Sequence, residues 1–133
     1  MATHEIGHVL GFVSDVGLKE LVPAAPVLPS VLDLFRFRPD VNLASFFADP
    51  RILSSGGEQI FFDLGNELEL STGRPDGSGG DGFQASHWKG IVVNPHQPPI
   101  GVMIPFISFG DRRVITKNDL RAFNTIGYQL SSE

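Results

Sequence analysis

The chain has 133 residues, enough for one domain of ordinary size, and about two fifths of them are hydrophobic. It holds 10 basic and 15 acidic residues without a basic stripe, which argues against a nucleic-acid partner. It also lacks cysteine, which excludes disulfides, thiolate metal ligands and cysteine nucleophiles, and no apolar run is long enough to span a membrane.

The first predicted element is a short helix over residues 2–10. Ile6, Val9 and Leu10 recur at helical spacing and share one side of this helix. Gly11 follows them and is a natural C-terminal stop.

The same helix carries the motif HExxH. His4 and His8 are four residues apart, so on a helix they project side by side and can offer two imidazole nitrogens to one metal ion. Glu5 lies next to that face, close enough to hold a water molecule on the metal without being a ligand itself. The motif therefore predicts a metal site with an adjacent base.

The next segments are less regular. Residues 22–30 contain three prolines and are expected to form an extended connector. Apolar and polar residues alternate over residues 31–40, which predicts a strand with Asp33 pointing outward and Pro39 ending it. A helical turn is expected within residues 44–57.

A hairpin is predicted in the middle of the chain. Its strands are expected at residues 59–64 and 68–71, with Gly65 and Asn66 near the turn.

A glycine-rich stretch over residues 71–82 follows the hairpin. Asp76 and Asp81 are oxygen donors among these glycines, but their spacing fits neither an EF-hand nor a nonapeptide calcium repeat. A flexible loop is the favoured interpretation, and calcium binding is left open.

The last predicted element is a helix over residues 117–129. Thr116 or Asn118 can cap it, and Asp119 suits the positive end of the helix dipole. Its apolar stripe consists of Leu120, Phe123 and Ile126.

Two histidines do not complete a catalytic zinc site, which usually has three protein ligands and an open position for water. In the compact pattern HExxHxxGxxH the third ligand falls at residue 14, which here is Ser14. Asp15 comes one position too late, and a solvated turn residue is the favoured interpretation of it. His87, directly after the glycine-rich stretch, and His96, between prolines, remain as candidates.

A methionine favours His87 over His96. Met103 is followed by Pro105 in the stretch IGVMIP, which fits a tight methionine turn beneath a zinc ion. His87 precedes this methionine by a short apolar segment, as a third ligand delivered from another part of the chain should.

With HEIGHVLGF, then a long insertion, then SHW and GVMIP, the chain resembles metzincin zinc metalloproteases of the leishmanolysin type and related bacterial metalloproteases. In those proteins an inserted segment displaces the third histidine far from the helix. The resemblance implies a secreted endopeptidase that hydrolyses peptide bonds of peptide or protein substrates by a zinc-bound water. The roles that it implies are His4, His8 and His87 as zinc ligands, Glu5 as general base, Met103 with Pro105 as the methionine turn, and Gly11 as the residue that lets the chain turn back.

The resemblance also implies an α+β fold that corresponds to the lower subdomain of a metzincin catalytic domain, with the upper sheet absent. The expected parts are a zinc helix (1–11), an insertion with strands and the glycine-rich loop (12–86), the third ligand and methionine turn (87–105) and a C-terminal helix (116–130). Only three residues precede His4 and no signal peptide is visible, so a missing N-terminal half is expected. Two alternatives therefore stay open, namely an inactive zinc-binding fragment of such a protease and a non-enzymatic zinc-binding domain.

Overall fold

The computed structural model describes residues 2–90 and 98–131. In that part of the chain, three α-helices, one 3₁₀-helix and a three-stranded antiparallel sheet make up a small α+β fold, which confirms the predicted class. The elements are α1 (Ala2–Val9), α2 (Leu18–Leu21), η1 (Leu32–Phe35), β1 (Arg36–Phe37), β2 (Ile60–Phe62), β3 (Glu67–Glu69) and α3 (Lys117–Thr125). Within the described residues, no helix is long and apolar enough to cross a membrane.

The sheet has the order β1-β2-β3, and its central strand separates two hydrophobic clusters. Because alternate residues of a strand face opposite sides, Ile60 and Phe62 pack into one cluster and Phe61 into the other. All three residues of β2 are therefore buried. The predicted hairpin is confirmed, with shorter strands and a connection over residues 63–66.

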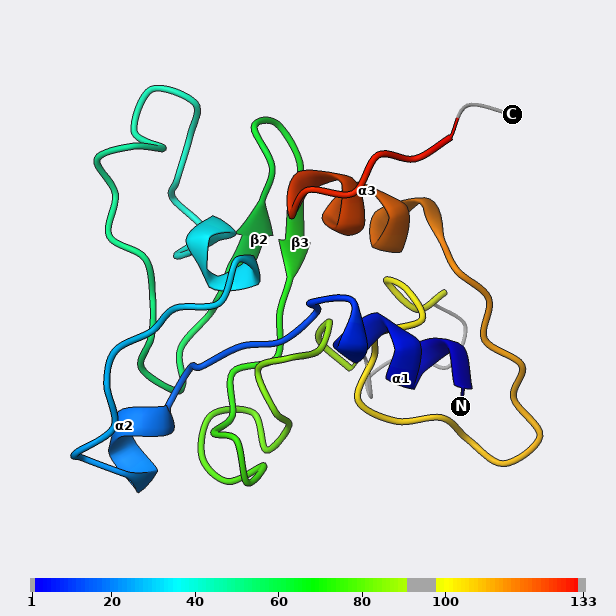
Figure 1. Ribbon diagram of the computed structural model, residues 1–133, viewed down its shortest axis with the longest axis horizontal. Coiled ribbons are helices and arrows are strands. Elements are labelled where there is room, and N and C mark those ends of the chain that lie inside the picture. Colours follow the sequence, from blue (N-terminus) through cyan, green and yellow to red (C-terminus); the bar gives the residue numbers. More distant parts are fainter. Residues whose placement is uncertain (1, 91–97, 132–133) are drawn as a thin grey trace.

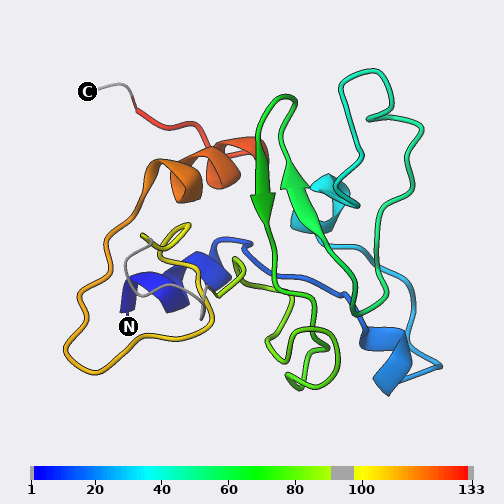
Figure 2. The same cartoon turned by 180° about the vertical axis from the view of Figure 1, so that it is seen from behind.

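The larger cluster brings the two ends of the chain together. The helices α1 and α3 lie on one side of the sheet, and the turn-rich segment 38–59 lies on the other (Figure 1, Figure 2). The buried members of this cluster are Phe12, Leu32, Phe61, Leu70, Trp88, Val102, Met103, Ile104 and Ala122.

Helix α1 packs on the core through a glycine. Gly7 is its buried residue, and a Cβ there would overlap the Met103 side chain, so the helix backbone lies directly against this methionine. The predicted apolar side faces away from the core, since Ile6 is 55% exposed and Val9 is 86% exposed. At the end of the helix Gly11 adopts φ +110°, which confirms the predicted stop.

Helix α3 begins at a capping box, in which the Asp119 amide donates to the Thr116 side chain and the Thr116 amide donates to the Asp119 side chain. It ends at Thr125 rather than near residue 130, so the predicted helix was too long. The reason is Gly127, which adopts φ +120°, together with bonds from the Gly127 and Tyr128 amides to the carbonyls of Asn124 (3.2 Å) and Phe123 (3.0 Å). These two bonds form a Schellman motif, which closes a helix.

The strand predicted over residues 31–40 was wrong in most of its length. Residues 32–35 form η1, and only Arg36–Phe37 pair with β2. Asp33 does not point outward but is fully buried, where it accepts an ion-pair hydrogen bond from Arg36 Nε at 3.1 Å. The buried partner decides the local structure here, and alternation alone does not reveal it.

Candidate metal centre

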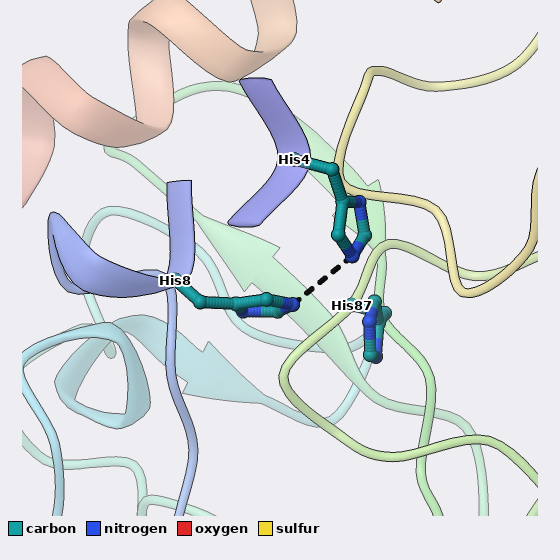
Figure 3. Close-up of side chains that lie close together, drawn as sticks. All are labelled: His4, His8 and His87. Atoms are coloured by element: carbon teal, nitrogen blue, oxygen red, sulfur yellow. Dashed lines mark hydrogen bonds between the residues drawn. The ribbon is translucent and has the colours of Figure 1, made fainter. Parts of the chain in front are cut away.

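Three histidine side chains meet between α1 and the loop that follows the glycine-rich stretch. His4 and His8 project from α1 toward His87, as Figure 3 shows. One ring nitrogen of each lies within 4.8 Å of those of the other two, and Nε2 of His4 lies 3.1 Å from Nε2 of His8. Helical spacing explains the first pair, and the path of the chain after β3 supplies the third ring.

Each of these rings is held from behind by a backbone carbonyl. His4 Nδ1 lies 2.9 Å from the Val102 oxygen and His8 Nδ1 lies 2.7 Å from the Phe12 oxygen. His87 Nδ1 lies 3.0 Å from the Gln84 oxygen. A carbonyl only accepts hydrogen bonds, so each Nδ1 carries a proton, and in the neutral form of each ring Nε2 keeps a free lone pair.

His87 is the most buried of the three, with 7% of its surface exposed. Burial lowers its pKa from the ordinary 6.5 to about 4, and the neighbouring His8 and His4 act in the same direction. The ring is therefore neutral at neutral pH, which is the form that binds a metal ion.

The chain just after His87 is hydrogen-bonded to the turn around Met103. Residues 102 and 103 form a turn, and Met103 is fully buried beneath α1. The Trp88 amide donates to the Met103 carbonyl at 2.9 Å, so the residue after His87 is bonded to this turn. Pro105 follows the turn and is partly buried.

The other predicted positions serve the fold or fall elsewhere. Ser14 donates through Oγ to Asp33 at 2.6 Å, and the Asp15 amide donates to the same carboxylate at 2.8 Å. Burial first, and then the charge of Asp33, raise the pKa of Asp15. Glu5 is exposed on α1, and His96 lies outside the described residues.

The aspartates of the glycine-rich stretch are used to hold that stretch together. Asp76 Oδ1 accepts from the amide and hydroxyl of Ser78, and Asp81 Oδ1 accepts from the amides of Thr72 and Phe83. Among the residues that the structure describes, the histidine cluster is the one group of three side chains placed to hold a metal ion. The favoured interpretation of this stretch as a flexible loop misses its dense internal hydrogen bonding.

The spacing of His4 and His8 matches that of two ligands on a tetrahedral metal ion. Zn–N bonds of about 2.0–2.1 Å place two ligand nitrogens about 3.3–3.4 Å apart, close to the 3.1 Å between the Nε2 atoms of His4 and His8. A nitrogen of His87 lies within 4.8 Å of both, and three imidazole ligands suit zinc as well as other transition metals. The cluster can therefore hold a metal ion, and its geometry leaves the identity of the metal open.

Sequence reasoning missed the groups that orient the rings. The carbonyls of Phe12, Gln84 and Val102 carry no signal in their residue types, because every residue has a carbonyl. The sequence predicts Asp119 as a residue that suits the helix dipole, and the structure shows that it also accepts a hydrogen bond from Trp88 Nε1 at 2.8 Å. The tryptophan directly after His87 was the available signal, because a buried indole N–H needs an acceptor.

No protein family, curated protein or solved structure matches this chain in the three comparisons made. The interpretation of the site therefore depends on the residues and geometry described above.

Proposed function

We propose that this chain is the zinc-binding part of a metalloendopeptidase, with His4, His8 and His87 as ligands and Glu5 as general base. One observation carries the proposal. One ring nitrogen of each histidine lies within 4.8 Å of those of the other two, while all three Nδ1 atoms are engaged by backbone carbonyls. With each Nδ1 protonated, the neutral forms of His4 and His8 have no proton left for the 3.1 Å contact between their Nε2 atoms, and a cation placed there would relieve this.

The reaction follows from the HExxH motif and from the resemblance to metzincins. A bound zinc ion would supply a Lewis acid for a scissile carbonyl and for water. Glu5 follows His4 on the exposed side of α1, where it is open to water and substrate. Its carboxylate would take a proton from the attacking water and pass it to the leaving amine. The histidines hold the ion, and the carbonyls behind them keep the rings in place.

The second candidate is a zinc-binding domain without hydrolysis, either a fragment or a domain completed by a partner. The exposed side of α1 favours it, because Ile6 and Val9 lie uncovered next to the motif. A peptide or protein substrate and a secreted parent protein are further parts of the proposal.

Zinc titration with a proteolysis assay tests the proposal. The wild-type chain is expected to bind one zinc ion, and His87→Ala to lose most of its zinc affinity. Glu5→Gln is expected to keep zinc and lose hydrolysis of a casein substrate, because only the proton acceptor changes. His96→Ala is the control and is expected to bind zinc like the wild type.

The outcomes separate the candidates. Zinc binding without any casein cleavage by the wild type would favour the non-hydrolytic domain. Equal cleavage by Glu5→Gln would contradict the role of Glu5, and loss of zinc in His96→Ala with retention in His87→Ala would move the third ligand to His96.

A further inference from the structure

Asp119 has more hydrogen bonds than a helix cap needs. It lies in the first turn of α3, is fully buried, and accepts four hydrogen bonds. Oδ1 accepts from Trp88 Nε1 at 2.8 Å, and Oδ2 accepts from the amides of Val102 (2.9 Å) and Thr116 (2.8 Å) and from Thr116 Oγ1 (2.9 Å). We propose that Asp119 is a positioning residue that sets the orientation of two metal ligands, His4 and His87. This inference rests on the proposed metal site.

The first connection runs to His4. The Val102 amide donates to Asp119, and the Val102 carbonyl accepts the hydrogen bond of His4 Nδ1. Both groups belong to one residue of the methionine turn, so only the two backbone torsions of Val102 separate the bond to Asp119 from the bond to His4. Gly101 allows this contact, because a Cβ at that position would overlap the Asp119 carboxyl group.

The second connection runs to His87. Trp88 is the next residue, and it is held at three points: its indole by Asp119, its amide by the Met103 carbonyl, and its carbonyl by Ser71 Oγ at 3.1 Å. With the Gln84 carbonyl behind the ring, His87 is held both at its imidazole and through the residue that follows it. One carboxylate is therefore connected both to His4 on α1 and to His87, which lies far along the chain.

A capping role and a positioning role make different demands. Capping α3 needs only the bonds between Asp119 and Thr116. Val102 adds a donor to Oδ2, the oxygen that Thr116 already uses, and Trp88 places a donor on Oδ1. Both carboxylate oxygens are therefore needed as acceptors. An asparagine offers only one acceptor oxygen, and its amide group would face a buried donor on the other side.

The experiment is a titration with Co²⁺, whose visible spectrum reports on the ligand geometry. Asp119→Asn is expected to bind Co²⁺ at least about tenfold more weakly than the wild type and to shift the spectrum, as loss of an orienting group does. The double variant Trp88→Phe with Asp119→Asn is expected to bind no more weakly than Trp88→Phe alone, because the donor that clashes with the amide is gone.

Thr116→Ala is the matched control. It removes a cap bond from the same carboxylate but leaves the bonds to Val102 and Trp88 in place, so the melting temperature is expected to fall without a change in Co²⁺ affinity. If Asp119→Asn does not fold, Gly101→Ala replaces it, because a methyl group there displaces the carboxylate without removing it.

The results distinguish this inference from the proposed function. Wild-type affinity and spectrum in folded Asp119→Asn, or in Gly101→Ala where that variant replaces it, would overturn the positioning role and leave the metal site standing. Parallel losses of stability and affinity in Thr116→Ala would overturn it too, since capping would then explain both. No Co²⁺ binding by the wild type would overturn the proposed function and this inference with it.

Discussion

At the scale of single residues, each ring of the cluster is oriented before any ion arrives. The three carbonyls that accept from Nδ1 come from different segments, namely those around Phe12, Gln84 and Val102. A ligand whose orientation is fixed by the fold loses little rotamer freedom on binding, so more of the coordination energy remains as affinity. The cluster is therefore organised by the backbone around it.

The low pKa of His87 predicts how the metal-free protein responds to pH. In the unfolded chain the ring titrates near 6.5, whereas in the folded protein it titrates at about 4, so the unfolded state binds more protons between these values. The contribution of the neutral His87 ring to the free energy of unfolding is expected to be fully present above pH 6.5 and to be lost as the pH drops toward 4. Urea unfolding in the presence of a chelator, at pH 7 and at pH 5, measures this.

The comparison needs a variant without the titrating ring. His87→Gln is expected to lose less stability between pH 7 and pH 5 than the wild type. The window also stays clear of Glu20, whose pKa is lowered to about 2 by hydrogen bonds from Ser55 and Arg74 and whose contribution is lost only below about pH 4.5. An equal pH dependence in both proteins would contradict the role of His87.

At the scale of elements, α1 and α3 end in the same way. In α1 the amides of Gly11 and Phe12 donate to the carbonyls of His8 and Gly7, each at 3.0 Å, which is the same Schellman motif that ends α3. The residue that follows the glycine then turns its carbonyl toward His8 Nδ1. Ending the helix and orienting a ligand are thus one local arrangement.

Gly11→Ala is expected to disturb both the end of α1 and the orientation of His8. Alanine is strained at φ +110°, so the free energy of unfolding is expected to fall by about 1 kcal/mol or more. Zinc affinity is expected to fall as well, because the Phe12 carbonyl moves with the turn. Chemical denaturation and zinc titration measure the two effects.

Gly110→Ala is the control for backbone strain alone. Gly110 also has a positive φ, +83°, and no atom lies within 4 Å of a Cβ there. It is expected to lose stability and keep wild-type zinc affinity. Equal affinity in the Gly11 and Gly110 variants would contradict the coupling of helix end and ligand.

The sequence predicts elements well where local signals decide them. Gly11 and the HExxH spacing predict α1 and its two histidines, and Thr116 with Asp119 predicts the start of α3. Residues 32–35 could not be predicted, because η1 depends on a carboxylate buried against an arginine and on partners far along the chain. The meeting of His87 with α1 depends in the same way on the path of about 80 residues.

At the scale of the whole molecule, a buried ion pair joins segments that are distant in sequence. Arg36 is fully buried beside Asp33, and it donates to the carbonyls of Ala85 at 2.6 Å and Ser71 at 3.2 Å and to the side chain of Gln59 at 2.9 Å. Burial lowers the pKa of this guanidinium, while Asp33 opposes the shift. The ion pair thus fixes the backbone two residues before His87.

Arg36→Met is expected to destabilise the protein strongly. It leaves Asp33 buried without its counter-charge, which costs about 3–5 kcal/mol of stability. Zinc affinity of the folded fraction is also expected to fall, because the Ala85 carbonyl is released. Urea unfolding and zinc titration are the measurements.

Arg121→Met provides the contrast. Arg121 pairs with Asp63 through two hydrogen bonds of 2.9 Å, but its side chain is 48% exposed, so the loss of stability is expected to be much smaller than that of Arg36→Met. A similar loss in both variants would contradict the importance of burial for the Arg36 pair.

Helix α1 has only a small apolar contact with the core, which bears on how readily this helix unfolds locally. Most helices are held by an apolar face, but α1 buries only Gly7 and leaves Ile6 and Val9 uncovered. Without an ion, little apolar area opposes fraying of this first helix as a unit while the sheet stays folded. An ion shared by His4, His8 and His87 would tie the helix to the interior through coordination bonds. Metal occupancy would then control the rate of amide hydrogen exchange in α1, whereas the hydrophobic core would control that rate in the sheet.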